Sequence, residues 1–305
     1  MTSSSSITQI VLKPNSPFDF NATVTSHGWV ALKPNAWDAK KATLTRIQQL
    51  DNGEVVRLTI RSNGSNQAPN LTVAIESKHQ LSGQQQNEIS SAVSYMLRLD
   101  EDLSGFYARC NKHKHWSFLN NGAGRLLRSP SLFEDLIKTI FTTNIQWGGT
   151  IRMTEELVNA LGKSFHLDHT LKAFPTPQAI VQAQDKLFET DIRLGYRTAY
   201  IREIAATVAS GNLELEAYQS SDLSTPELRK VLLSIKGIGN YAAATMLMFL
   251  ERYDELAIDT VFRDFVTKRY FNGKKAGEKE MRAIYDQWDE WKFLAFWFDM
   301  WKSET

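Results

Sequence analysis

The sequence of 305 residues contains a single cysteine, Cys110, and no long apolar run. One sulfur cannot build an intramolecular disulfide, a cysteine-based zinc finger or an all-thiolate iron–sulfur cluster, because each of these needs several sulfurs within reach. The N-terminus also lacks the basic segment and apolar core of a secretion signal. We therefore expect a soluble protein of a reducing compartment that has no membrane as partner.

The sequence has almost no excess charge, since 35 Lys and Arg oppose 34 Asp and Glu and leave +1. The sum alone does not indicate a polyanionic partner. The distribution is less even, because three stretches are rich in bases and poor in acids. We expect local positive surfaces from Arg109, Lys112, Lys114, Arg125 and Arg128, from Arg229, Lys230 and Lys236, and from the five bases between Arg263 and Lys275, which oppose only Asp264.

The first third of the chain has the pattern of β-strands. The segments KATLTRIQQL and EVVRLTI are rich in alternating β-branched residues, and Asp51, Asn52 and Gly53 between them form a strong hairpin signal. A third segment, LTVAIE, follows a loop rich in Gly, Ser and Asn. These segments predict an antiparallel sheet.

From about Asn87 onward the apolar residues recur with helical spacing. One stripe contains Leu132, Phe133, Leu136, Ile137, Ile140 and Phe141. Ser129 before Pro130 is the expected start of this helix, and Thr225 before Pro226 is another start. Further helices are predicted over 149–161, 198–210, 241–250 and 260–270. The expected architecture is a small sheet followed by a larger helical body.

The segment SIKGIGNYAAA predicts two helices joined by a tight turn. The first helix ends at Ile235, and the second begins at Asn240 or Tyr241. Glycines let the backbone approach another molecule closely, and the free amides at the start of a helix can hold a phosphate oxygen. Ile238 would fill the gap between the helices. The alternative is that the two glycines only make a tight connection.

Asp259 follows Gly239 by twenty residues and precedes a predicted helix that begins at Thr260. Aspartate is a common N-cap, which is the simplest role for this residue. The helix amides would favour its ionised form and fix a negative charge. Such a charge can stabilise an oxocarbenium ion on a sugar or orient the water that attacks it.

The combination of IKGIG with an aspartate about 20 residues later resembles the helix-hairpin-helix (HhH-GPD) superfamily of base-excision DNA glycosylases. The segments YMLRLDEDLSGFY, GAGRLLRSPSLFEDLIKTIFTTNIQ, FPTPQAIVQAQ and IRLGYRTAYIREIA resemble, in this order, parts of 8-oxoguanine and 3-methyladenine II glycosylases. The resemblance runs from about Phe20 to the C-terminus.

The resemblance implies an α+β, mostly α fold. An antiparallel sheet domain similar to that of the TATA-binding protein would span residues 1–100. A two-lobed helical body with the helix-hairpin-helix and a DNA cleft would follow it. One lobe, 126–258, would contain the hairpin, and the other, 101–125 plus 259–305, would close the base pocket.

The resemblance also assigns roles to individual residues. Asp259 would be the catalytic residue. Asn144 would enter the gap left by a flipped nucleotide, Tyr196 would wedge beside the estranged base, and Arg197 would hydrogen-bond that base. Without the family, these three are a polar residue at a helix end, a loop tyrosine and a solvated arginine. The DNA backbone would lie against Lys236, Gly237, Ile238, Gly239 and Asn240.

Bifunctional members of the superfamily have a lysine two residues after the second hairpin glycine, where this chain has Tyr241. Without that amine no Schiff base forms, so we expect hydrolysis without lysine-dependent lyase activity. The flipped base would be held by aromatic or apolar faces. The candidates are Gly28, Trp29, Trp147, Tyr241, Thr245 and Trp297.

Alkylated purines such as 3-methyladenine or 7-methylguanine are the expected substrates, because their positive charge favours stacking on aromatic rings. The alternative lesion is 8-oxoguanine. A hypothesis of another class is a non-catalytic DNA-binding or damage-sensing protein. We expect a monomer that binds double-stranded DNA containing a damaged base, with no cofactor and no metal site beyond a possible monovalent cation at the hairpin. The location would be cytoplasmic, at the nucleoid, in a bacterium and nuclear in a eukaryote.

Overall fold

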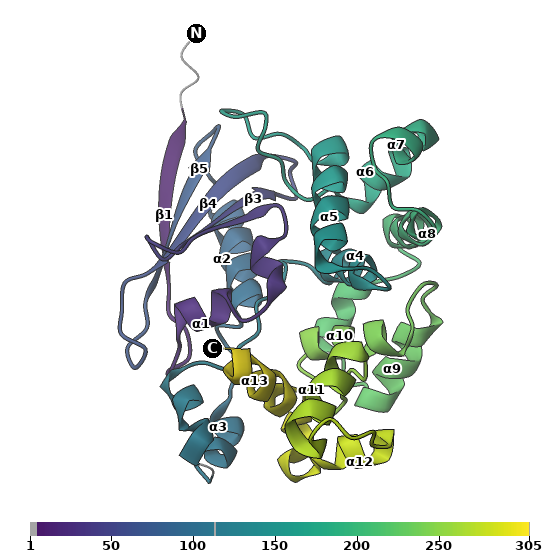
Figure 1. Ribbon diagram of the computed structural model, residues 1–305. Helices are drawn as coiled ribbons and strands as arrows, with labels where there is room; N and C mark the ends of the chain where they lie inside the picture. Colours follow the sequence, from purple (N-terminus) through teal and green to yellow (C-terminus); the bar gives the residue numbers. More distant parts are fainter. Residues whose placement is uncertain (1–4, 113, 305) are drawn as a thin grey trace. The chain divides into compact units, whose positions relative to one another are not determined.

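The computed structural model describes residues 5–112 and 114–304, without the side chains of 114, 115 and 302–304 (Figure 1). The chain divides into two compact units, Met1–Leu213 and Glu214–Thr305. The first unit contains a five-stranded sheet and the first eight α-helices, and the second is helical. The fold is therefore mostly helical with an N-terminal antiparallel sheet, as predicted.

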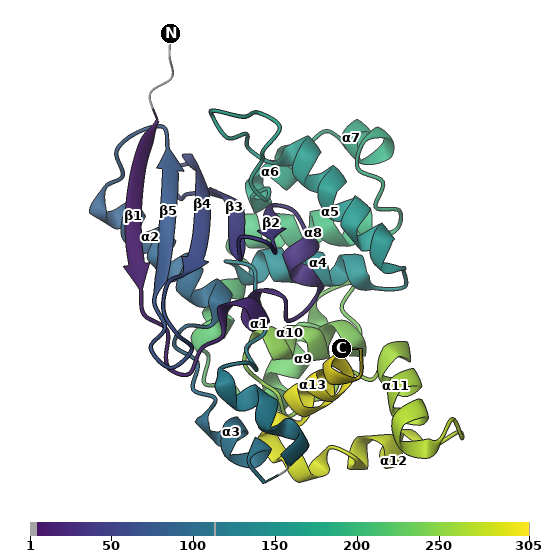
Figure 2. The same cartoon turned by 60° about the vertical axis from the view of Figure 1, so that its left-hand side comes forward.

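The sheet has the strand order β1-β5-β4-β3-β2, and every neighbouring pair is antiparallel. The strands are β1 (Ser6–Leu12), β2 (Asn35–Asp38), β3 (Thr43–Gln49), β4 (Val55–Ser62) and β5 (Leu71–Ser77). Its inner face is apolar, because Leu58 of β4 and Ile75 of β5 lie opposite each other and are fully buried. The helix α2 (Gly83–Leu97) lies across one face of the sheet (Figure 2).

The three predicted strands and the hairpin at Gly53 are confirmed as β3, β4 and β5. Gly53 has a φ of +83°, which is the left-handed conformation that the turn needs. The two edge strands were not predicted. In β1 the outward residues Ile7 and Val11 are apolar, so the strand shows no alternation, and β2 has only four residues.

The helices of the first unit surround a core built on α4 (Leu132–Thr142) and α5 (Trp147–Leu161). Ser131 is the N-cap of α4, since its hydroxyl accepts a hydrogen bond from Glu134 N at 3.2 Å. The prediction that this helix starts at Ser129 was therefore wrong, because the cap is Ser131. The other elements are α1 (Phe20–Val24), η1 (Gly28–Ala31), α3 (Ser104–Cys110), η2 (Lys114–Asn121), α6 (Pro177–Gln182), α7 (Asp185–Thr190) and α8 (Arg197–Ala209).

Two of the bases predicted to form a positive surface are buried instead. Arg125 donates to the backbone carbonyls of four residues, among them Arg98 and Glu101. Arg128 lies over the ring of Tyr95, with its guanidinium carbon 3.7 Å from the ring centroid. Both guanidinium groups satisfy buried carbonyls, so they add no charge to the surface. Of the other predicted bases in this stretch, Arg109 is half-buried and Lys112 is exposed, while the side chain of Lys114 lies outside the described residues.

The second unit contains the predicted hairpin and the aromatic C-terminal helix. Its elements are η3 (Leu215–Ser220), α9 (Thr225–Ser234), α10 (Asn240–Phe249), α11 (Thr260–Phe271), α12 (Glu278–Ala283), η4 (Asp286–Trp291) and α13 (Lys292–Glu304). Phe262 of α11 and Phe296 of α13 meet edge to face with centroids 4.9 Å apart, which anchors the core of this unit. The five bases between Arg263 and Lys275 are all exposed, as predicted.

The helices that the structure describes include none with the length and apolar character needed to cross a bilayer.

Candidate functional site

The helix-hairpin-helix of the second unit has the predicted boundaries. Helix α9 ends at its C-cap Ile235, and α10 begins at Asn240 with Gly239 as N-cap. The turn is closed by a hydrogen bond of 3.0 Å from Ile238 N to Ile235 O. The side chain of Ile238 is 7% exposed, so it is buried at the turn. The first amides of α10 have no carbonyl partner within the helix, which leaves donors at the turn.

The two glycines of the turn have different roles. Gly237 has a φ of +92°, a conformation that residues with a β-carbon rarely adopt. Gly239 has an ordinary φ of −98°, and no atom lies within 4 Å of the position that a β-carbon would take. Gly237 is therefore needed by the turn itself, whereas Gly239 leaves open space beside the start of α10.

Polar side chains flank the same turn. Arg229 of α9 donates a hydrogen bond of 2.8 Å from Nη2 to Asn240 Oδ1, which ties the two helices together at the turn. Lys236 is exposed within the turn. The arrangement places a cation and helix amides on one short segment, which is a combination suited to a phosphate group.

Asp259 is the N-cap of α11, as predicted, and its Oδ1 accepts a hydrogen bond of 2.7 Å from Phe262 N. Burial raises the pKa of this carboxyl, although the backbone hydrogen bonds of Phe262 and Val261 act against the rise. The expected shift in favour of the ionised form was therefore wrong, because desolvation outweighs the helix amides. A carboxylate with a raised pKa is better suited to accept a proton near neutral pH.

Tyr241 and Thr245 lie one turn apart on α10. Tyr241 is half-buried, and its carbonyl accepts a hydrogen bond of 3.0 Å from the Thr245 hydroxyl. Thr245 is buried, and its hydroxyl is occupied by this hydrogen bond within the helix. Tyr241 is the member of this pair with accessible surface.

Trp297 of α13 is half-buried and stacks on the buried ring of Phe293. The two ring centroids are 6.1 Å apart and the rings are nearly parallel, with an interplanar angle of 6°. Phe293 therefore backs Trp297, and part of the indole stays accessible. Trp288, Phe296 and Phe298 of the same C-terminal stretch are buried in the core.

In the first unit, Gly28 and Trp147 are in direct contact. Gly28 begins η1, and a β-carbon built on it would lie 2.4 Å from both Cη2 and Cζ2 of the Trp147 ring. Trp147 begins α5 and is 40% exposed. Two residues predicted for the base pocket thus form one face, made of a backbone segment and an aromatic ring.

Trp29 has a different position from the one predicted. Its side chain is 5% exposed, and its Nε1 donates a hydrogen bond of 2.7 Å to Asp135 Oδ1. The ring faces the core and offers no open surface for stacking. The sequence did not single out Asp135 beyond its place near a helix start, because nothing local indicates that the residue reaches a tryptophan 106 positions away.

Asn144 and Tyr196 lie next to each other on the surface of the first unit. Asn144 has a φ of +49° between α4 and α5, and its Nδ2 donates a hydrogen bond of 3.4 Å to the Tyr196 hydroxyl. Tyr196 is 53% exposed at the start of α8, and the hydrogen bond from Asn144 lowers its pKa. The predicted gap-filling residue and the predicted wedge are therefore neighbours.

Arg197, in contrast, is buried. Its Nε donates to Ile140 O at 3.3 Å, its Nη2 donates to Thr143 O, and its guanidinium carbon is 4.5 Å from the centroid of the Tyr196 ring. Neither the predicted contact with an estranged base nor a solvated side chain describes this placement. Arg197 thus links the start of α8 to the end of α4, and its guanidinium group packs against the Tyr196 ring.

Among the residues that the structure describes, no group of three His, Cys, Asp or Glu side chains could hold a metal ion.

Comparison with solved structures gives the fold a wider context. The 3-methyladenine DNA glycosylase from Archaeoglobus fulgidus matches with a TM-score of 0.73 at 22% identity, over 94% of this chain and 96% of that one. The 8-oxoguanine glycosylase/lyase of Clostridium acetobutylicum matches in its apo form with a TM-score of 0.68 at 16% identity, over 95% of this chain and 94% of that one.

The same Clostridium acetobutylicum enzyme, in complex with double-stranded DNA that has cytosine opposite 8-oxoguanine, matches with a TM-score of 0.66 at 15% identity, over 97% of this chain and 99% of that one. Neither the family models nor the curated protein sequences gave a match. The chain therefore has the fold of helix-hairpin-helix DNA glycosylases, and at these identities the likeness establishes the fold alone.

Proposed function

We propose that this chain is a DNA glycosylase that flips a damaged purine out of double-stranded DNA and hydrolyses its N-glycosidic bond. The observation that carries the proposal is Asp259, a partly buried carboxylate with a raised pKa that caps α11 twenty residues after the hairpin glycine Gly239. The glycosylase fold and the phosphate-binding geometry of the hairpin support it.

In this proposal the second unit supplies the chemistry. Asp259 accepts a proton from the attacking water or stabilises the positive charge that develops on the sugar. The hairpin from Lys236 to Asn240 holds the DNA backbone through helix amides and one ammonium group. In the first unit, Tyr196 inserts beside the estranged base and Asn144 enters the space that the flipped nucleotide leaves.

The product is an abasic site that this chain leaves uncut. Lysine-dependent strand cleavage needs an amine that attacks C1′ of the sugar to form a Schiff base. Tyr241 occupies the position where bifunctional members of the superfamily have that lysine. The test is borohydride trapping on a duplex with an active lesion, where no covalent protein–DNA adduct is expected. A trapped adduct would contradict monofunctional hydrolysis without contradicting base release.

The preferred substrates are purines alkylated at a ring nitrogen, such as 3-methyladenine and 7-methylguanine. These bases carry a positive charge, and indole faces attract cations by about 0.5–2 kcal/mol. Trp297 offers an accessible indole backed by Phe293, and Trp147 offers one backed by Gly28. Base release from methylated DNA and from an 8-oxoguanine duplex, measured side by side, tests the choice of lesion.

The role of Asp259 is tested by Asp259→Asn. Asparagine caps helices as well as aspartate does, so the melting temperature should change little. Single-turnover base release from methylated DNA is expected to fall at least ~10²-fold, the order of effect of one positioned acid–base group. Wild-type protein should also lose activity on acidification as Asp259 takes up a proton. Unchanged base release by Asp259→Asn would overturn the catalytic assignment.

Other expectations accompany the proposal. The chain would act as a monomer without a cofactor, with a monovalent cation as the one candidate ligand of the hairpin carbonyls. The three-part domain division and the cellular location stay predictions. A non-catalytic DNA-binding role predicts tight binding to damaged duplex with no abasic-site formation, so the methylated-DNA assay separates it from the enzyme.

A further inference from the structure

The backbone around Gly28 is tied to the chain that leads into α4. His27 lies before Gly28, and its Nε2 is 2.7 Å from Leu127 O. Trp29 lies after Gly28, and its Nε1 donates to Asp135 Oδ1 at 2.7 Å. Both neighbours of Gly28 are thus fixed to one continuous segment of the first unit. Gly28 itself has no side chain, so contacts of its neighbours such as these hold its backbone in place.

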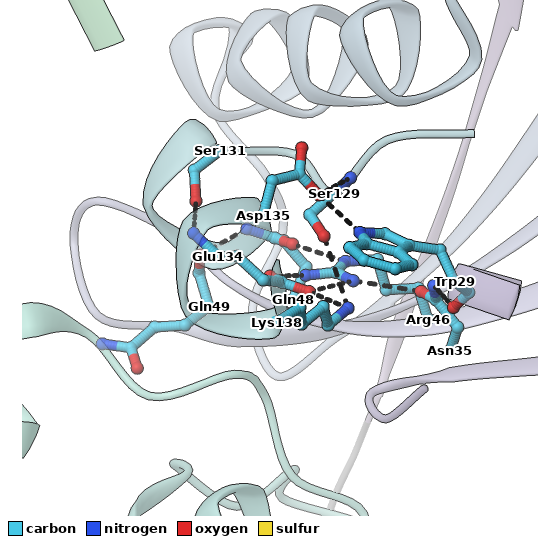
Figure 3. Close-up of polar contacts among 10 residues, drawn as sticks. All are labelled: Trp29, Asn35, Arg46, Gln48, Gln49, Ser129, Ser131, Glu134, Asp135 and Lys138. Carbon is cyan, nitrogen blue, oxygen red and sulfur yellow. Dashed lines mark hydrogen bonds and ion pairs between the residues drawn. The ribbon is translucent and has the colours of Figure 1, made fainter. Parts of the chain in front are cut away.

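A second set of contacts holds the backbone of Trp29 (Figure 3). Trp29 O accepts a hydrogen bond of 3.2 Å from Asn35 Nδ2, and Asn35 Oδ1 accepts one of 3.0 Å from Arg46 Nη1. Arg46 forms a bidentate ion pair with Glu134, in which Nη1 donates to Oε1 at 3.1 Å and Nη2 donates to Oε2 at 2.5 Å. Lys138 Nζ donates to the same Oε1 at 2.6 Å. All three charged side chains are buried. The sheet and α4 together immobilise the first turn of η1.

Asp135 is the contact that reaches the indole directly. Its Oδ1 accepts hydrogen bonds from Trp29 Nε1 and, at 2.9 Å, from Ser129 N. Among the described residues, its buried Oδ2 has no hydrogen-bond partner. Burial raises the pKa of Asp135 to about 7, against the effect of these hydrogen bonds. Asp135 therefore acts through Oδ1 as a hydrogen-bond acceptor, and Oδ2 does not contribute to holding the indole.

The same helix also fixes the ring that faces Gly28. Near the end of α4, Phe141 O accepts a hydrogen bond of 2.9 Å from Thr150 Oγ1, which lies in the first turn of α5. Trp147 is the first residue of α5. Helix α4 thus controls both sides of the contact: Asp135 at its start reaches Gly28 through Trp29, and Phe141 at its end reaches the turn that carries Trp147.

We propose that Asp135 is a positioning residue for base binding, which holds Gly28 against Trp147 through the Trp29 indole. The inference rests on the proposed function, because the face made by Gly28 and Trp147 is taken there as part of the base pocket. A displacement of about 1 Å at a binding face can cost ~10²-fold in rate even when the residue changed is far from the chemistry.

The first test is spectroscopic and needs no substrate. In protein labelled with ¹⁵N-tryptophan, the Trp29 and Trp147 indole signals are assigned by Trp29→Phe and Trp147→Phe. Asp135→Leu removes the acceptor, Asp135→Asn keeps an acceptor oxygen, and Glu156→Gln changes a carboxylate of α5 that pairs with Arg152 and Arg193 on the surface. Asp135→Leu should shift the Trp147 signal, whereas Glu156→Gln should not.

The Trp29 signal should also titrate near pH 7 in the wild-type protein and not in Asp135→Asn. Several charged groups face Asp135 and must be considered. Lys138 and Glu134 lie on α4, Arg46 comes from β3, and His27 precedes η1. Burial lowers the pKa of His27 to about 4 and also lowers the pKa of Lys138. A transition near pH 7 is therefore assigned to Asp135 by its loss in Asp135→Asn, which keeps both His27 and Lys138.

The second test is single-turnover base release from methylated DNA. Asp135→Leu and Trp29→Phe should each lower the rate tenfold to a hundredfold, and Asp135→Asn should stay within about threefold of wild type. Trp29→Phe keeps an aromatic ring in the core and removes the N–H donor together with part of the indole, so it breaks the same contact if Asp135→Leu does not fold. An unmoved Trp147 signal, or wild-type rates in a folded variant without the contact, overturns the proposal.

The two proposals fail in different ways. If the wild-type protein releases no base from any lesion, the proposed function fails, and the Trp147 signal still reports whether Asp135 positions Gly28. If the wild-type protein is active and the Trp147 signal ignores Asp135→Leu and Trp29→Phe, the positioning role alone fails.

Discussion

The indole of Trp147 lies directly on the backbone of Gly28, so closely that a β-carbon on Gly28 would be 2.4 Å from two ring atoms. Real β-carbons do not approach other atoms at that distance, so any larger residue at position 28 must displace the ring. Trp147 is 40% exposed, so part of its ring faces solvent. The contact therefore couples one backbone position to the orientation of one exposed aromatic face.

Gly28→Ala is expected to displace the Trp147 ring with little loss of stability, within about 1 kcal/mol, because the displaced ring lies at the surface. Base release should fall at least tenfold if this face holds the base. Gly83→Ala is the matched control, since no atom lies within 4 Å of the position that its β-carbon would take. Indole NMR and single-turnover assays check both variants, and an unmoved ring in Gly28→Ala would contradict the coupling.

The hairpin glycines are expected to respond to different degrees. Gly237→Ala should destabilise the protein by about 1–2 kcal/mol, because φ is +92° at this position. Gly239→Ala should cost less than about 1 kcal/mol, since its φ of −98° suits any residue and the loss is only that of a better N-cap. The same methyl group should weaken DNA binding, because it occupies the space next to the α10 amides. Urea unfolding and duplex affinity, measured together, separate the effects; unchanged affinity in Gly239→Ala argues against DNA contact there.

Tyr196 and Arg197 are adjacent, yet their substitutions should affect different properties. Tyr196→Ala removes an exposed ring and should change stability by no more than about 0.5 kcal/mol while it weakens binding to lesion-containing duplex. Arg197→Ala removes the donor to the half-buried carbonyl of Thr143 and one of several donors to Ile140 O, and should cost about 1–3 kcal/mol. Thermal melting and lesion affinity distinguish the two. A stable Arg197→Ala with lost affinity would instead restore a direct DNA contact for Arg197.

The buried carboxyl of Asp135 should leave a signature in the pH dependence of stability. Its folded-state pKa of about 7 lies above its usual 3.8, so the native state holds a proton that the unfolded chain has released. This contribution to the free energy of unfolding is complete at low pH and is lost as the pH rises from about 4 to 7, at up to about 1.4 kcal/mol per pH unit.

His27 has the opposite slope in nearly the same window. Its folded-state pKa of about 4 lies below its usual 6.5, so it contributes stability that grows as the pH rises between these values. The two slopes oppose each other in the wild-type protein. Asp135→Asn removes the falling slope of Asp135 and keeps the rising slope of His27, so the stability of the variant should gain relative to wild type from pH 4 to pH 7. Urea titrations across this range check the difference, and parallel curves would show that Asp135 keeps its ordinary pKa.

Several elements were predictable because their signals are local. The strands β3 and β4 were marked by alternation and by the turn at Gly53, and the hairpin was marked by a helical stripe that stops just before Gly237. Asp259 as N-cap follows from its place before an apolar helical pattern. In each case the residues that indicate the element lie within a few positions of each other, where local geometry restricts the backbone conformation.

The amino-acid sequence by itself determined three strands of the sheet, the hairpin and the cap, because their backbone conformation follows from neighbouring residues. Only the tertiary structure decided which polar groups are buried, and with what partner. It placed Arg125 and Arg197 on backbone carbonyls and Trp29 on Asp135, and it raised the pKa of Asp259. These outcomes depend on desolvation and on partners distant in sequence, and a local pattern contains neither.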